Sequence, residues 1–145
     1  MRDKLGLFGE DKNDKKLILD LLDWMKINKA DFTNTFCYLM NIKLGENKIY
    51  LNQEFTNWLE LWHKRVNLNN LNNKHLELMK SVNPIVIPRN HKVEEALKTA
   101  SEGNIKRFND FLKILQTPYE NKSNILDFQN PAPITNEKYQ TFCGT

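Results

Sequence analysis

Apolar residues recur at intervals of three and four along most of the 145-residue chain, which is the spacing of one helix face. Six such stripes predict six helices, around residues 17–25, 32–40, 55–66, 71–82, 93–100 and 105–115. No stretch alternates apolar and polar residues for long enough to predict a strand. The pattern therefore predicts an all-α fold, with about six helices in a compact orthogonal or bundle-like domain.

Residues that cap or break helices punctuate this pattern. Short polar side chains that can accept a hydrogen bond from a first helical turn precede three of the stripes: Asn13 or Asp14, Asp31, and Asn52. The fourth and sixth stripes stop before Pro84 and Pro118. Between the last two stripes, Gly103 can take the left-handed conformation and Asn104 can cap the next helix. This tight spacing predicts an antiparallel helix pair.

Three segments lack a helical stripe. Residues 67–73 are mostly Asn and predict either a flexible loop between two subdomains or the polar start of a helix. Residues 85–87 are apolar and lie between two prolines, so an extended, buried connector fits better than a paired strand. Residues 117–145 contain three prolines. We therefore expect a helical domain over 1–116 and an irregular, extended tail over 117–145.

The composition excludes some classes of function. The net charge is +3, and Lys and Arg alternate with acidic residues, so the excess does not indicate a nucleic-acid partner. No apolar run is long enough to span a bilayer and no charged-then-apolar leader opens the chain, so we expect no membrane partner and a cytoplasmic location. Two cysteines at unrelated positions, Cys37 and Cys143, do not form a disulfide framework.

Residue patterns that carry chemistry are few. No glycine-rich loop is present to hold phosphate groups, so no cofactor is expected in this chain. The histidines His63, His75 and His91 lack the spacing of metal ligands, and Asp20 and Asp23 belong to a solvated helix face. Of the tryptophans Trp24, Trp58 and Trp62, two lie in apolar stripes at i and i+4, so core packing is favoured over stacking on bases. The sequence therefore predicts no catalytic residue and no metal site.

Five segments, in this order, carry a family resemblance. They are Met1-Arg-Asp-Lys-Leu-Gly-Leu7, Lys29-Ala-Asp-Phe-Thr-Asn-Thr-Phe36, Asn83-Pro-Ile-Val-Ile-Pro-Arg-Asn-His91, Thr117-Pro-Tyr-Glu120 and Tyr139-Gln-Thr-Phe-Cys-Gly-Thr145. The series resembles the C-terminal region of the selenoprotein O (YdiU-like) family of kinase-fold protein adenylyltransferases. The resemblance implies AMP transfer from ATP to protein hydroxyls by a kinase-like core. ATP and Mg²⁺ would bind in that core, and none of its binding residues maps onto this chain.

The resemblance implies that this chain is inactive by itself. Its partner would be the upstream kinase-like core of the same protein, which it would scaffold. Apolar surface that normally meets that core would favour self-association of the isolated chain. Two other classes remain open: a stand-alone helical protein-interaction module, and a nucleic-acid binder, which would need Lys and Arg gathered on one face.

Two places carry candidate site residues. The resemblance implies a redox role for Cys143, whereas an inert exposed thiol is the alternative; Cys37 lies in a helical stripe and is expected to be buried. The second place is the proline-bounded loop from Asn83 to His91. Its candidate contacts to the core or to a ligand are Asn83, Pro84, Pro88, Arg89 and Asn90. Arg89 could fork onto a carboxylate or phosphate, but a buried structural connector is the favoured interpretation.

Overall fold

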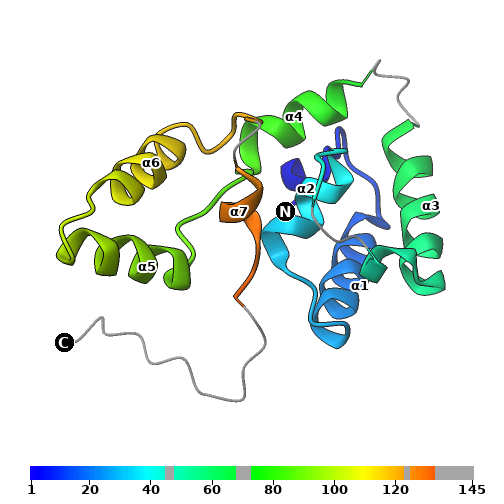
Figure 1. Cartoon of the computed structure of the whole chain (residues 1–145). Helices are drawn as coiled ribbons and strands as arrows, with labels where there is room; N and C mark the ends of the chain where they lie inside the picture. The colour runs from blue at the N-terminus through cyan, green and yellow to red at the C-terminus, as the bar shows by residue number, and fades with distance from the viewer. Residues whose placement is uncertain (45–47, 68–72, 123–124, 133–145) are drawn as a thin grey trace, which may run out of the picture. The chain divides into compact units, whose positions relative to one another are not determined.

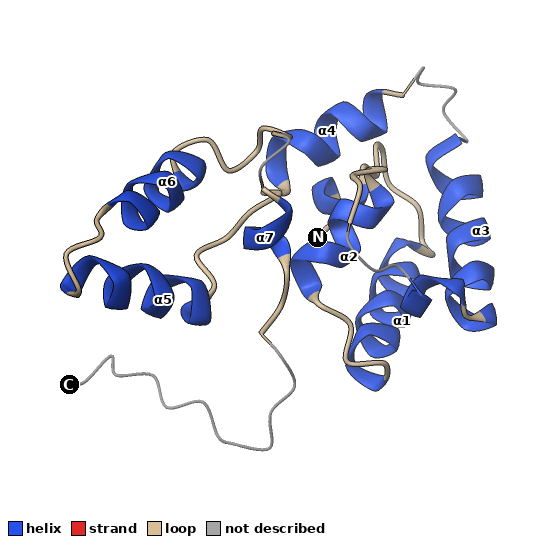
Figure 2. Ribbon diagram, viewed as in Figure 1, coloured by secondary structure: helices blue, strands red, loops and turns tan. Residues whose placement is uncertain are grey.

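The computed structural model describes residues 1–44, 48–67, 73–122 and 125–132. The described regular structure consists of helices and no strands, as Figure 2 shows. The α-helices are α1 (Asp14–Ile27), α2 (Phe32–Leu39), α3 (Gln53–Asn67), α4 (Lys74–Val82), α5 (Asn90–Ser101), α6 (Lys106–Leu115) and α7 (Leu126–Gln129). Two short 3₁₀ helices, η1 (Asp3–Leu5) and η2 (Lys48–Leu51), complete the set. The predicted all-α class is confirmed.

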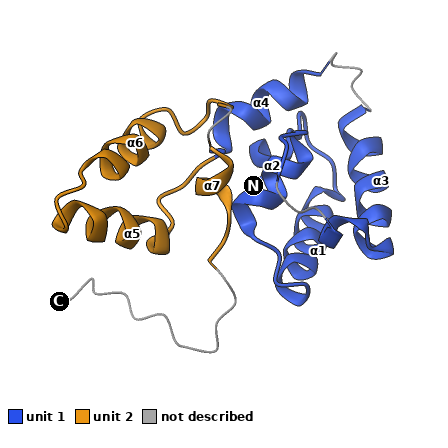
Figure 3. Cartoon of the chain, in the orientation of Figure 1, with its two compact units in different colours: residues 1–85 blue, residues 86–145 orange. Residues whose placement is uncertain are grey.

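The chain divides into two compact units, residues 1–85 and 86–145 (Figure 3). Unit 1 holds α1 to α4 with both 3₁₀ helices, and unit 2 holds α5 to α7 (Figure 1). The division into a helical domain over 1–116 and a tail over 117–145 stays a prediction.

Unit 1 is built around aromatic side chains. In this unit α1 packs on α3, and η1 packs on α4. The rings of Trp24 and Phe55 lie 4.5 Å apart, and those of Tyr38 and Tyr50 stack at 4.3 Å. Burial raises the pKa of the Tyr50 phenol to about 12. The buried tryptophans confirm the core assignment made from the apolar stripes.

Three helix caps were predicted in unit 1, and two of them make the expected hydrogen bond. Asp31 accepts a hydrogen bond from the Asn34 N–H at 2.8 Å, and Asn52 accepts one from the Phe55 N–H at 2.8 Å. Asn13 stands at the N-cap of α1, but its side chain makes no capping bond. Asp14 is instead the first residue of α1, and its carboxylate is engaged elsewhere.

Unit 2 contains the predicted helix pair. Helices α5 and α6 pack against each other (Figure 1), and Gly103 between them has a φ of +91°. The Asn104 side chain accepts a hydrogen bond from the Lys106 N–H at 3.2 Å. The short helix α7 was not expected. Phe128 of α7 is buried and stacks on Phe111 of α6, with ring centroids 5.0 Å apart.

The buried face of α6 differs from the predicted one. The predicted stripe was Ile105, Phe108, Leu112 and Leu115. The structure buries Phe111 and Ile114, while Ile105 and Leu112 are 60% and 45% exposed. Phe111 and Ile114 border the predicted stripe on the same apolar side of α6, so periodicity alone could not say which part of that side the rest of the unit covers.

Candidate functional site

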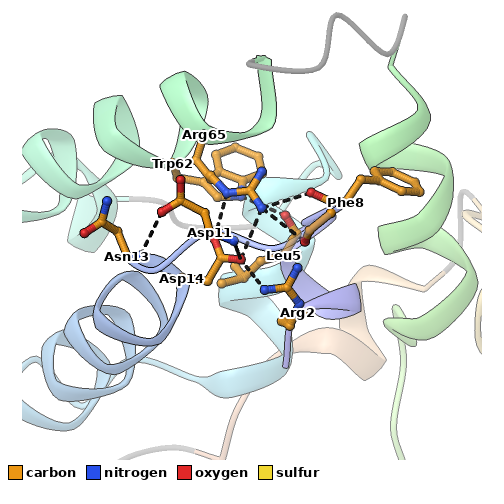
Figure 4. Close-up of polar contacts among 9 residues, drawn as sticks. Arg2, Leu5, Phe8, Asp11, Asn13, Asp14, Trp62 and Arg65 are labelled. Atoms are coloured by element: carbon orange, nitrogen blue, oxygen red, sulfur yellow. Dashed lines mark hydrogen bonds and ion pairs between the residues drawn. The ribbon is translucent and has the colours of Figure 1, made fainter.

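A buried ion cluster joins the first residues of unit 1 to α3. The Asp14 carboxylate, at the start of α1, accepts two hydrogen bonds from the Arg65 guanidinium, at 2.7 Å from Nε and 3.1 Å from Nη2. Arg2 forms a further ion pair with the same carboxylate (Figure 4). Asp14 is 3% exposed and Arg65 is 9% exposed. A forked pair at this depth is a strong, geometrically specific contact.

The Arg65 side chain also fixes the backbone that precedes α1. Its Nη2 donates to the carbonyl oxygens of Phe8 at 2.9 Å and Gly9 at 3.4 Å. On the same helix, the Trp62 indole N–H donates to the Leu5 carbonyl at 2.9 Å (Figure 4). Helix α3 therefore holds residues 5–14 through two side chains one turn apart.

The electrostatics of Asp14 are those of a structural carboxylate. Burial alone would raise its pKa, but the hydrogen bonds and charge of Arg65, together with the charge of Arg2, outweigh burial and lower the pKa. A carboxylate held by two guanidinium groups is a poor base and has few lone pairs left for a metal ion. The cluster stabilises the fold and provides no catalytic group.

The proline-bounded segment that the sequence singled out connects the two units, since the boundary falls between Ile85 and Val86. In unit 1 the buried Asn83 side chain donates to the Lys4 carbonyl at 2.9 Å and accepts from the Lys4 ammonium at 3.2 Å. In unit 2 the Val86 N–H donates to the Pro118 carbonyl at 3.3 Å. Each half of the segment is thus fastened within its own unit, and Ile85 and Val86 are buried as expected.

The remaining candidates of that segment border the start of α5. Pro84 and Arg89 are half-buried, while Pro88 and Asn90 are exposed. Arg89 occupies the N-cap position of α5, and its carbonyl accepts from the Val93 N–H at 3.0 Å. Pro88 and Arg89, with His91, line a hollow of about 330 Å³ in unit 2. The structure therefore separates Asn83, which is tied into the core of unit 1, from the later residues.

The structure describes one of the two cysteines. Cys37 is fully buried in α2, and its thiol lies 3.8 Å from the Ile85 carbonyl oxygen, as expected for a buried residue. The redox candidate Cys143 lies outside the described residues.

In the described part of the chain, the other singled-out histidines and aspartates do not meet across helices, with one exception. Asp20 pairs with Lys16 on the surface of α1, at 2.7 Å. Among the described residues, no three His, Cys, Asp or Glu side chains form a group that could hold a metal ion. The exception concerns His63 of α3 and His75 of α4, which both contact the Trp62 ring. Sequence reasoning missed this pair because twelve residues and a helix boundary separate its members.

No helix in the described part of the chain is long and apolar enough to cross a membrane.

The geometry defines an all-helical protein region in which the buried Asp14 and Arg65 bind each other and the backbone. The family model for "Protein adenylyltransferase SelO" matches residues 1–116, and the chain belongs to that family. Among its relatives, a protein named protein nucleotidyltransferase YdiU from Pelagibacter ubique is 53% identical over 146 aligned positions. Proteins of the same name from Nitrosococcus oceani and Clostridium perfringens are 42% and 40% identical.

The extent of these matches is as informative as their identity. Each alignment covers 100% of this chain but 30% of the relative. The chain therefore spans about a third of the length of the proteins it matches, and it corresponds to a part of a YdiU protein.

Proposed function

We propose that this chain is the C-terminal helical region of a SelO-type protein adenylyltransferase and that it scaffolds a kinase-like core supplied by the rest of that protein. The core would bind ATP and Mg²⁺ in the cytoplasm and transfer AMP to protein hydroxyl groups. The observation that carries the proposal is the 53% identity over the whole chain to 30% of a nucleotidyltransferase.

The state of the polar groups supports a scaffolding role. The buried charges, Asp14 and Arg65, are committed to each other and to the backbone. Phosphoryl-transfer enzymes need carboxylates that hold Mg²⁺, and no three His, Cys, Asp or Glu side chains of the described residues form a group that could hold a metal ion. Chemistry would thus depend on residues outside this chain.

Exposed apolar side chains of unit 2 support a docking role. Leu97 of α5, Ile105 before α6 and Leu112 of α6 are each between 45% and 60% exposed. In the relative from Pelagibacter ubique, about 70% of the length lies outside the matched part (100% less 30%). That remaining part of the protein is the natural partner for such an exposed apolar surface. Without that partner, the same residues would drive self-association. The second candidate function, a stand-alone interaction module, rests on the same exposed residues.

A chimera tests the proposal. This chain would replace the matched 30% of the Pelagibacter ubique relative, and AMP transfer from labelled ATP would be measured with Mg²⁺ and an acceptor protein. We expect transfer by the chimera, none by the 145-residue chain alone, and loss of activity or solubility when the matched part is deleted. Self-labelling by the chain alone would refute the proposal. Full activity of the deleted relative would favour the interaction module.

The segment before α5 offers a finer test of contact with the core. Replacing Arg89 by Lys keeps the charge but removes the planar fork. If Arg89 holds a carboxylate or phosphate of the assembled enzyme, the chimera should lose activity without losing stability. If it is a structural connector, stability should fall and activity should follow it.

We also propose that Cys143 is the redox-responsive thiol of the family, on a tail that spans residues 117–145. Brief alkylation of the native chain, read by mass spectrometry, should modify Cys143 before the fully buried Cys37. In the chimera, oxidation should protect Cys143 and a reductant should restore its labelling. Equal labelling of both thiols would contradict the first expectation, and constant labelling of Cys143 would contradict the second.

A further inference from the structure

A hollow of about 600 Å³ lies within unit 1, lined by residues of α2, α3 and α4. This volume is in the range of about 300–1,000 Å³ that is usual for small-molecule sites. Part of its lining is apolar, contributed by Leu59, Trp62, Val66 and Leu76. Trp62 is 2% exposed and forms a fixed base, so the apolar surface open to the hollow comes mainly from the half-buried Leu59 and Leu76.

The rest of the lining is rich in hydrogen-bond donors. It includes one ammonium group and two imidazoles, from Lys43, His63 and His75, and the side-chain amides of Asn41, Asn67 and Asn73. None of the described lining residues is an Asp or a Glu. The hollow can therefore carry up to three positive charges without a carboxylate among those residues to balance them.

The two imidazoles meet at the same indole. The Trp62 ring centroid lies 5.0 Å from that of His63 and 6.1 Å from that of His75. Burial, and secondly the neighbouring His63, lowers the pKa of His75. A negative charge placed beside His75 would favour its protonated form. An anion in the hollow would supply it.

His75 and Trp62 of this lining are held in place by the N-terminal segment. A Cβ atom at Gly6 would come within 2.7 Å of the His75 carbonyl oxygen, so η1 lies directly against the first turn of α4. The Trp62 indole N–H is bonded to the Leu5 carbonyl of the same segment. Since the backbone of His75 and the ring of Trp62 are both fixed by residues 5 and 6, the wall is preorganised for a ligand.

We propose that this hollow binds a small phosphate ester as the metal-free anion. A phosphate dianion matches one Lys and two His better than a singly charged carboxylate does. The apolar wall around Trp62 suits the organic part of an ester. The lack of a carboxylate in the described lining argues against a Mg²⁺-bound nucleotide, because Mg²⁺ is held by oxygen ligands. This binding site is separate from the activity proposed above and does not depend on it.

Nuclear magnetic resonance of the imidazole C–H groups provides the test, because the chain has three histidines. Inorganic phosphate, phenyl phosphate and benzoate are titrated into the 145-residue chain. We expect saturable shifts of the His63 and His75 resonances with both phosphates, and a rise in the pKa of His75 when the anion is bound. His91, which belongs to unit 2, is the internal control and should not move. Phenyl phosphate should bind more tightly than inorganic phosphate.

Matched variants locate the site. His75→Gln and Lys43→Gln each remove a charge from the wall and should weaken phenyl phosphate binding about tenfold, the loss expected for one charge-assisted hydrogen bond. Lys64→Gln is the control, because Lys64 is exposed and follows His63 in α3 but does not line the hollow. Folding of each variant is checked by tryptophan fluorescence, since all three tryptophans lie in unit 1.

Several results would overturn the proposal. Equal shifts of all three histidines would indicate a general effect of ionic strength. Binding of benzoate in preference to phenyl phosphate would exclude a phosphate site, and equal affinity for the two phosphates would exclude an ester. The same affinity in His75→Gln, Lys43→Gln and the parent chain would place any binding elsewhere.

Discussion

The two units of this chain each contain a network of Arg with carboxylates, and the networks differ in depth. In unit 1, Asp14 and Arg65 are almost fully buried. In unit 2, Arg107 of α6 pairs with Glu95 at 2.6 Å and Asp127 at 2.9 Å, and Lys92 joins them. The side chains of Glu95 and Asp127 are 43% and 52% exposed.

This difference separates two uses of the same chemistry. A buried pair cannot lose one member without leaving an uncompensated charge, so it enforces one arrangement of the chain. An exposed network is solvated when broken and is screened by salt. The unit 2 charges lie around Phe128, which Lys92 and Arg107 approach at 6.0 and 5.7 Å, so they cover an apolar ring more than they fix a backbone.

The largest expected effect comes from breaking the buried pair. Arg65→Met removes both hydrogen bonds to Asp14 and those to the Phe8 and Gly9 carbonyls. We expect a loss of about 3 kcal/mol in the unfolding free energy of unit 1, the lower end of the range for a broken buried pair, because Arg2 still pairs with Asp14. Urea titration followed by tryptophan fluorescence measures it, because all three tryptophans lie in unit 1.

Lys64→Met is the matched control for that change, because Lys64 is an exposed neighbour on the same helix. It should alter the same free energy by less than about 0.5 kcal/mol. Equal effects of the two variants would show that the Asp14 pair contributes no more than a surface charge.

The second expected effect compares two glycines in left-handed conformations. Gly6 has a φ of +65° and Gly103 has a φ of +91°. A Cβ at Gly6 would meet the His75 backbone at 2.7 Å, whereas one at Gly103 would meet nothing within 4 Å. Gly6→Ala should therefore cost about 2–4 kcal/mol, from backbone strain plus overpacking, and Gly103→Ala about 1–2 kcal/mol from strain alone. Thermal unfolding of both variants, followed by circular dichroism, tests this order, and the reverse order would contradict the tight contact of η1 with α4.

Lowering the pH should destabilise the two units differently, by less than the substitutions above. The pKa of Asp14 is lowered in the folded chain from its ordinary value of 3.8, so the unfolded chain binds the proton first as the pH falls. This contribution to stability is fully present well above pH 3.8 and declines as the pH falls from there toward the folded pKa. The pKa values of Glu95 and Asp127 are also lowered, but their exposure makes that contribution sensitive to salt.

The measurement is urea unfolding between pH 6 and pH 3, at low and high salt. The loss of stability of unit 1 at low pH should persist in high salt and should be reduced in Asp14→Asn. An acid response that vanishes in salt would show that the Asp14 carboxylate is effectively at the surface.

These comparisons also show what the sequence could predict. Asp31 and Asn52 were recognised as caps because each bonds a backbone N–H three residues later, so the signal is local. Asp14 was one of two candidates for the same role, the other being Asn13, but its partner Arg65 is 51 positions away and no spacing rule connects them. The helix pair around Gly103 was predicted correctly for the same local reason.

The candidate sites follow the same division. Burial of Cys37 could be predicted from its position in an apolar stripe. The meeting of His63 and His75 at Trp62 could not, because it depends on how α4 packs beside α3 in three dimensions. On α6 the helix was predicted correctly but the residues that it buries were not, because the sequence of one helix does not say which neighbour covers it.

The smallest expected effect is that of the exposed network. Arg107→Gln removes the ion pairs to Glu95 and Asp127 but leaves both carboxylates in contact with water. We expect a loss of about 0.2–1 kcal/mol in the stability of unit 2, which should shrink further in 0.5 M salt as screening increases. Hydrogen exchange of the α5 and α6 amides measures unit 2 separately from the tryptophan signal of unit 1. Arg107→Lys should recover part of the loss, because a single ammonium can pair with one carboxylate but lacks the fork that reaches both. A loss as large as that of Arg65→Met would mean that exposure does not decide the strength of these networks, and the contrast between the two units would fail.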